Sequence, residues 1–200
     1  MTEAPAVIDL LRSAVPAAVI EPGTASDMPT LYADREHVLE VLTALRDHPG
    51  LQFTLLSDMT AVDLLPAEPR YEVVYHLACL GAAFATGTPA PARRLRVKVR
   101  LSGHDHVMPS VTGIYPSANW PEREVFDLFG IGFSNHPDLR RILTAEDWTG
   151  HPLRKDYPVP VRKTPQAWSP IQVSAEEFAE HVRGQREKAR REIEAETPRD

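Results

Sequence analysis

The chain has 200 residues, of which 22 are basic and 28 acidic, and its formal net charge is −6. A protein that binds nucleic acid nonspecifically needs clustered Lys and Arg, so this charge argues against that function class. A single cysteine, Cys79, excludes an internal disulfide and any iron–sulfur or zinc site built from this chain's cysteines alone.

Two further features bear on location. No apolar run approaches the ~18 residues of a membrane-spanning helix, and residues 1–4 lack the basic start of a secretory signal. A lone cysteine is typical of a reducing compartment. We therefore expect a cytoplasmic protein without a segment that crosses a membrane.

The first fifty residues predict two helices joined by a linker. Residues 5–15 have the apolar pattern of a short helix, whereas residues 16–33 contain three prolines and one glycine and predict a loop. Asp34 is placed to cap a second helix that runs to about His48. Its apolar residues recur at helical spacing: Val38, Val41, Leu42 and Leu45.

Alternating apolar and polar residues predict three strands, Leu51–Ser57, Tyr71–Cys79 and Arg94–Leu101. In the last of these, four cations alternate with four aliphatic residues, so the cations share one face. The segment between the last two strands, residues 81–93, is rich in Ala, Gly, Thr and Pro and predicts a hairpin tip. We expect an antiparallel sheet with one face toward solvent or a partner. Cys79 lies on the apolar side, where a buried hydrophobe is expected instead of a nucleophile.

Residues 119–129 predict a helix. Asn119 and Glu122 have the spacing of a capping box, and Gly130 is placed to end the helix in the left-handed conformation. The apolar residues on one side of this helix are Val125, Leu128 and Phe129.

Residues 131–170 have no sustained period. Prolines are dense there, with five between residues 151 and 170, and we expect an extended arm that lies on a surface and is ordered at low entropic cost by proline. Ser174 and Glu177 form a second capping box, and the charged helix that they start is predicted to run to about Glu194. Its thin apolar stripe consists of Phe178, Val182, Ala189 and Ile193.

These elements predict an α+β fold, with an antiparallel or mixed sheet of about four strands packed by two main helices. An extended Pro-rich arm and a charged C-terminal helix follow. The expected regions are an N-terminal helix and linker (1–33), an α+β core domain (34–134), a docking arm (135–170) and a helical tail (171–200).

Motifs for catalysis are sparse. The sequence contains no dinucleotide-binding glycine pattern, phosphate-binding loop or nucleophile elbow. His104 and His106 could ligate a metal, but no second cluster has ligand spacing, and a polar turn explains them equally. His136 and His151 each precede proline, a pattern typical of a ring that packs at a turn and donates a hydrogen bond.

Charges of both signs alternate with large apolar residues between residues 122 and 157, which is typical of a protein interface. Apolar anchors supply affinity there, and arginine forks fix orientation. Arg123 and Asp127 are also spaced to pair within one helix. The candidate interface residues are Glu122, Arg123, Glu124, Asp127, His136, Asp138, Arg140, Arg141, His151, Arg154, Lys155 and Asp156.

Three ordered blocks carry a family resemblance. Residues 118–131 (ANWPEREVFDLFGI), 136–143 (HPDLRRIL) and 150–158 (GHPLRKDYP) resemble the signature of the C-subunit family of NADH-quinone oxidoreductase (respiratory complex I). Residues 55–63 and 70–77 resemble it as well. The resemblance spans roughly residues 34–160 and leaves the N-terminal region and the tail uncovered.

The resemblance implies a structural, non-catalytic subunit of the peripheral arm of the complex, located on the cytoplasmic side of the cell membrane. It implies no catalytic, cofactor-binding or metal-binding residue in this chain. FMN, the iron–sulfur clusters and quinone are expected in other subunits of the complex, and the expected neighbours are its D and B subunits, and also its I subunit. The interface residues above are then its docking surface.

Two other interpretations stay open. An equivalent scaffold subunit occurs in membrane-bound nickel–iron hydrogenases. The chain could also be a standalone metal-dependent hydrolase that uses His104 and His106.

Overall fold

The computed structural model describes residues 3–80, 92–158, 174 and 176–184. The chain divides into two compact units, residues 1–158 and 159–200. The elements of the first unit, in chain order, are α1 (Glu3–Ala14), β1 (Ile20–Pro22), β2 (Thr30–Ala33), α2 (Val38–Asp47), β3 (Leu55–Asp63), β4 (Tyr71–Cys79), β5 (Arg93–Leu101), β6 (Val107–Pro109), the 3-10 helix η2 (Pro116–Ala118), α3 (Asn119–Phe129) and β7 (Gly132–Ser134).

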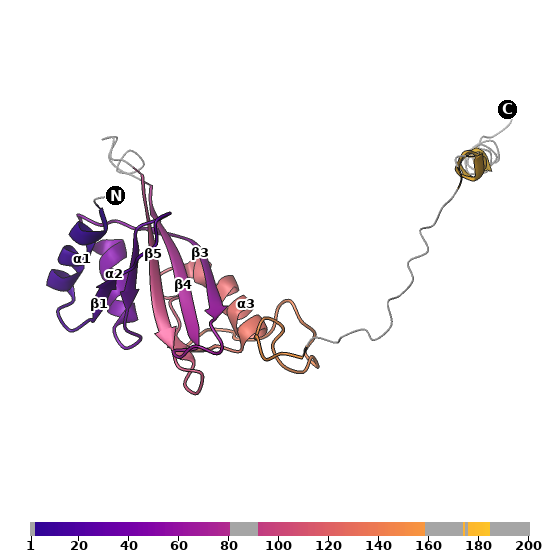
Figure 1. The fold of residues 1–200 in the computed structure, drawn as a ribbon. Coiled ribbons are helices and arrows are strands. Elements are labelled where there is room, and N and C mark those ends of the chain that lie inside the picture. The colour runs from indigo at the N-terminus through magenta and orange to yellow at the C-terminus, as the bar shows by residue number, and fades with distance from the viewer. Residues whose placement is uncertain (1–2, 81–91, 159–173, 175, 185–200) are drawn as a thin grey trace, which may run out of the picture. The chain divides into compact units, whose positions relative to one another are not determined.

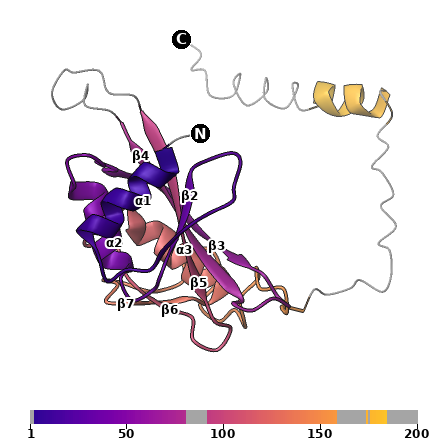
Figure 2. The same ribbon diagram turned by 60° about the vertical axis from the view of Figure 1, so that its left-hand side comes forward.

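The main sheet has five strands in the order β1-β2-β5-β4-β3. Strand β2 pairs with β5 in parallel, and the other neighbours are antiparallel, so the sheet is mixed. Helix α3 lies behind β3 and β4 (Figure 1), and the turned view shows α1 and α2 together beside it (Figure 2). The predicted α+β class is confirmed.

The core forms where the alternating residues of the strands meet the apolar sides of the helices. On β5 the aliphatic residues Leu95, Val97, Val99 and Leu101 are buried, and their partners on β4 include the fully buried Tyr71 and Tyr75. Helix α2 contributes Val38, Val41, Leu42 and Leu45, as its spacing predicts. Cys79 is buried in the same core.

The cations of β5 lie on the opposite face of the sheet. There Arg96 pairs with Asp27, Lys98 with Glu72, and Arg100 with Glu21. The predicted alternation is therefore confirmed on β5, whereas on β4 residues 71–75 are all buried. Acidic residues from the N-terminal region and β4 offset much of the positive charge of β5.

Two predictions near the N-terminus were wrong. Residues 16–33 contain β1 and β2 instead of forming only a loop, because Thr30–Ala33 can pair with β5 despite the flanking prolines. The strand expected at Leu51–Ser57 begins only at Leu55; Gln52, with φ 53°, interrupts an extended chain there.

The predicted cap of α2 also differs. Helix α2 begins after His37, and the Asp34 carboxylate accepts hydrogen bonds from the backbone N–H groups of Val19 and His37. Asp34 thus joins the start of β1 to the turn before α2.

The second unit contains a helix over residues 176–184. Its predicted capping box is confirmed, since Glu177 N donates to Ser174 Oγ (3.2 Å) and Ser174 N donates to the Glu177 carboxylate (2.9 Å). The rest of this predicted helix, arm residues 159–170 and the hairpin tip at 81–91 lie outside the described residues. None of the helices in the described ranges is long and apolar enough to cross a membrane.

Candidate protein interface

Helix α3 and arm residues 135–158 form one structural unit around the carboxylate of Asp127. Asp127 is fully buried, and its Oδ2 accepts hydrogen bonds from the backbone N–H groups of Ile142, Leu143 and Thr144 at 2.7–3.1 Å. Its Oδ1 accepts from Arg141 Nη1 at 2.9 Å and from the Thr144 hydroxyl. One helix carboxylate therefore fixes a turn of the arm.

The predicted pairing of Arg123 with Asp127 was wrong. Arg123 instead donates to the backbone oxygens of Arg140 (3.1 Å) and Arg141 (3.5 Å). Its guanidinium also lies over the ring of Trp120, with 5.1 Å between the guanidinium carbon and the ring centre. Arg123 and Asp127 of α3 thus both bind the arm, because an arm without regular structure leaves its backbone groups free for side-chain partners.

The predicted capping box at the start of α3 was also wrong. Asn119 makes no capping bond, and the preceding 3-10 helix η2 leads directly into α3. Glu122 is fully buried and accepts a hydrogen bond from the backbone N–H of Val111 at 2.7 Å. Glu122 therefore binds Val111 from another segment instead of Asn119 at the start of its own helix.

The other end of α3 is closed by Gly130 and the arm. Gly130 is left-handed, with φ 72°, as predicted. Arg154 donates from Nε to Phe129 O at 2.5 Å, and His151 donates from Nδ1 to Asp127 O at 2.8 Å. These side chains satisfy carbonyls that the last turn of a helix leaves unpaired.

Replacing Gly130 by alanine should lower the free energy of unfolding by about 1–3 kcal/mol. An added Cβ would lie 2.4 Å from Arg154 Nη2 and 2.5 Å from His151 Nε2, at a backbone conformation that favours glycine. Urea unfolding measures the change. Gly113→Ala is the matched control, because a Cβ there meets nothing within 4 Å.

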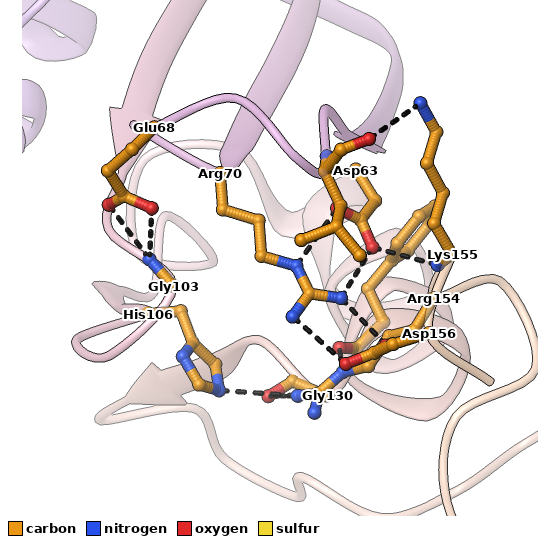
Figure 3. Close-up of polar contacts among 11 residues, drawn as sticks. Asp63, Glu68, Arg70, Gly103, His106, Gly130, Arg154, Lys155 and Asp156 are labelled. Atoms are coloured by element: carbon orange, nitrogen blue, oxygen red, sulfur yellow. Dashed lines mark hydrogen bonds and ion pairs between the residues drawn. The ribbon is translucent and has the colours of Figure 1, made fainter.

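A second charged cluster joins the arm to the end of β3 (Figure 3). Asp63, whose side chain is 2% exposed, accepts from Arg70 Nε (3.0 Å) and Nη2 (2.8 Å) and from the backbone N–H of Lys155 (2.9 Å). Arg70 also donates to Asp156 at 2.7 Å. The hydrogen bonds from Arg70 hold the pKa of Asp63 well below its ordinary value.

Acid should weaken both attachments of the arm. Burial opposes ionisation of Asp127, but the hydrogen bonds from Thr144, Leu143 and Ile142 prevail and lower its pKa, as Arg70 does for Asp63. A carboxyl with a depressed pKa adds stability that is complete above its unfolded pKa of about 3.9 and is lost as pH falls through the folded value.

We therefore expect the free energy of unfolding to fall as pH decreases below about 5. Urea unfolding at a series of pH values measures this, and Asp127→Asn should flatten the slope. Glu122 has the opposite effect on the change of stability with pH, since burial raises its pKa. A stability that rises on acidification would show that the two aspartates do not dominate.

The twelve predicted interface residues therefore fall into two groups. Seven are buried or half-buried and make hydrogen bonds to other residues of this chain: Glu122, Arg123, Asp127, His136, Arg141, His151 and Arg154. Five are exposed: Glu124, Asp138, Arg140, Lys155 and Asp156. His136 and His151 make hydrogen bonds to backbone carbonyls, as the His-Pro pattern in the sequence predicts.

Large apolar side chains are exposed in the same region, α3 and the arm. They are Trp120 (64% exposed), Leu143 (62%), Leu153 (51%) and Trp148 (45%). Three of these lie in the arm, and their mixture with charges is what the sequence indicated. Trp120, Asp63 and Arg70 were missed as members of this region, although Asp63 and Arg70 lie inside blocks that carry the resemblance.

The two histidines considered for metal binding, His104 and His106, differ in exposure. His104 is exposed, whereas His106 is half-buried, with Nε2 3.3 Å from Arg154 Nη2 and its ring 5.5 Å from that of Tyr71. Burial and then the charge of Arg154 lower the pKa of His106. Across the described ranges, no three His, Cys, Asp or Glu side chains are grouped to hold a metal ion.

Comparison with known proteins identifies the family. A sequence model described as the respiratory-chain NADH dehydrogenase 30 kDa subunit matches residues 31–163, which include α3 and most of the arm. The chain belongs to this family. The NADH-quinone oxidoreductase C subunit of Roseiflexus sp. strain RS-1 is 43% identical over 153 residues, covering 76% of this chain and 83% of that protein.

Another C subunit and two solved structures are also similar to this chain. The C subunit of Citrifermentans bemidjiense is 47% identical over 131 residues, or 65% of this chain and 74% of that one. The solved trypsin-resistant fragment (1–134) of Nqo5 superposes with a TM-score of 0.52 at 31% identity, covering 68% of this chain and 98% of the fragment. A chain of an archaeal membrane-bound sulfane sulfur reductase shares the fold (TM-score 0.61, 24% identity, 79% and 87% covered).

Proposed function

We propose that this chain is the C subunit of a proton-pumping NADH-quinone oxidoreductase and serves it as a cofactor-free, non-catalytic structural component. It docks beside the quinone-site subunits in the peripheral arm of the complex, on the cytoplasmic side of the cell membrane. The complex passes electrons from NADH through FMN and iron–sulfur centres to quinone, and these groups belong to its other subunits. The D and B subunits are the proposed neighbours, and the I subunit is a further one.

The observation that carries this proposal is the exposed apolar surface of α3 and the arm, within the matched family region. A monomeric protein rarely exposes several large apolar side chains on one segment without a partner to cover them. Tryptophan and arginine are frequent interface anchors, and Trp120, Trp148 and Arg140 are exposed here. Asp63 and Asp127 hold the arm in shape, so little entropy is lost when a partner binds it.

Capture of the tagged chain from detergent-solubilised native membranes, followed by mass spectrometry, tests the proposal. We expect the D and B subunits with the unmodified chain and at least tenfold less of them with the double variant Leu143→Glu/Leu153→Glu. Val19→Glu is the matched control, because Val19 is equally exposed (61%) but lies before β1. Circular dichroism checks that each variant is folded.

Two outcomes contradict the proposal. One is recovery of the unmodified chain from native extract without any other component of an NADH-oxidising complex. The other is capture of partners by the double variant at the level of the control.

A further inference from the structure

His106 lies where the arm meets the C-terminal end of α3 (Figure 3). Its ring Nε2 is 3.3 Å from Arg154 Nη2, and the same guanidinium donates to Phe129 O and lies 3.4 Å from Gly130 O. The backbone of His106 is fixed separately, because its carbonyl oxygen accepts from Gly132 N at 3.1 Å. His106 therefore joins Arg154, and with it the arm, to the segment before β6.

The contact with Arg154 determines the tautomer of His106. An arginine side chain has only donors, so Nε2 must be the acceptor and carry no proton. The proton of the neutral ring then lies on Nδ1, which is buried. Neutral His106 can hold Arg154, whereas a protonated ring would turn an N–H group toward the N–H groups of the guanidinium.

The charged groups around the ring oppose its protonation. Arg154 faces the ring from the arm. The ring of Tyr71 packs against His106 from β4, with 5.5 Å between the two ring centres, and Arg70 lies over that tyrosine at 4.8 Å. Asp105, from the same loop as His106, is an acidic neighbour, but its side chain is 62% exposed and already pairs with an arginine at 2.7 Å. A charged imidazole would therefore lie between two cations without a buried counter-ion.

The same groups set the direction of the pH effect. Burial and then the charge of Arg154 lower the pKa of His106, and the backbone of Gly103 and the carboxylate of Asp105 offset them only in part. Glu68 faces the same loop, where its carboxylate accepts from Gly103 N at 3.1 Å. A histidine with a lowered pKa adds stability that is complete above its unfolded pKa of about 6.5 and is lost as pH falls through the folded value. This loss begins at a higher pH than that from the two buried aspartates.

We propose that His106 is a pH-sensitive latch for the arm. At neutral pH its uncharged ring accepts from Arg154 and keeps the guanidinium on the carbonyls that end α3. Protonation in mild acid removes this acceptor and adds a second positive charge, so this part of the arm loosens while Asp63 and Asp127 still hold their own parts. The latch belongs to the chain itself and does not depend on the proposed partners.

Hydrogen exchange of the full chain tests the latch. The Leu153 amide reports on this part of the arm, because it donates to Leu128 O at 3.0 Å. Its protection factor should fall about three- to tenfold between about pH 7 and about pH 5 in the unmodified chain. His106→Gln should abolish this fall, because a glutamine amide oxygen can accept from Arg154 and does not titrate. His104→Gln is the matched control: it removes an exposed histidine from the same loop and should keep the fall.

Heteronuclear NMR of the imidazole rings gives a second measurement, on the unmodified chain. His106 should carry its proton on Nδ1 at neutral pH and titrate below about pH 6.5. Three results would each overturn the proposal: a proton on Nε2, titration of His106 at or above about pH 6.5, or an equal fall of Leu153 protection in His106→Gln and the unmodified chain. The NMR measurement decides the matter even where His106→Gln does not fold.

Discussion

Replacing Asp127 by asparagine is expected to lower the free energy of unfolding by about 3 kcal/mol. The substitution keeps the shape of the side chain but removes its charge and turns an amide N–H₂ toward the N–H groups that Asp127 binds. Hydrogen bonds to a charged group contribute about 1.5–3 kcal/mol each, and more than one is lost here. Urea unfolding followed by circular dichroism measures the change.

Hydrogen exchange distinguishes local from global effects of this substitution. The amides of Ile142, Leu143 and Thr144 should lose protection in Asp127→Asn, because each donates to the Asp127 carboxylate. Asp138→Asn is the control: Asp138 lies in the same region, but its side chain is 48% exposed and pairs with an exposed arginine. Exposed pairs contribute at most about 1 kcal/mol. Equal effects of the two substitutions would contradict the role assigned to Asp127.

Replacing Arg70 by alanine should cost about 3–5 kcal/mol of unfolding free energy. Asp63 would keep its charge in a buried site without the cation that balances it, and breaking a buried pair from one side is strongly destabilising. Arg140→Ala is the control, since that guanidinium is 67% exposed and pairs with Asp138 on the surface. Thermal and urea unfolding both report the difference.

A double substitution separates this charge effect from lost packing. Asp63→Asn removes the uncompensated carboxylate, so Arg70→Ala/Asp63→Asn should be more stable than the sum of the two single changes predicts. Additive losses would show that Arg70 acts through packing against the Tyr71 ring, which its guanidinium carbon approaches to 4.8 Å.

The sequence predicts those helices and strands in which apolar residues recur at a regular spacing. Strands β4 and β5 and helix α2 follow apolar repeats, and the residues of these repeats are buried; on β4, Glu72 and Val74 of the other face are buried as well. Strands β1 and β2 are short and lie among prolines, and each is extended where a neighbour offers a partner, β5 for β2 and β2 for β1. Local pattern cannot reveal a pairing between residues more than sixty positions apart.

The candidate interface shows the same limit. The alternation of charge and apolar residues predicts an interface in α3 and the arm, and Leu143, Trp148 and Leu153 are exposed there. It could not show which charges face inward. Glu122 and Asp127 have ordinary helical positions in sequence, and only the tertiary fold supplies the backbone donors of Val111 and Thr144 that bury them.

The attachment of the arm to β3 also constrains the order of folding. Arg70 bonds to Asp156 across 86 positions, and Lys155 bonds to Asp63 across 92. Closing such long loops is slow, because chain entropy is lost before the contact forms. During synthesis the sheet can assemble with Asp63 already bound by Arg70 and Leu65 N, while Asp127 still lacks its donors in residues 141–144, and the arm closes over both carboxylates last. Translation must therefore proceed beyond residue 155 before the two buried carboxylates have all of their donors, because the last one is the backbone N–H of Lys155.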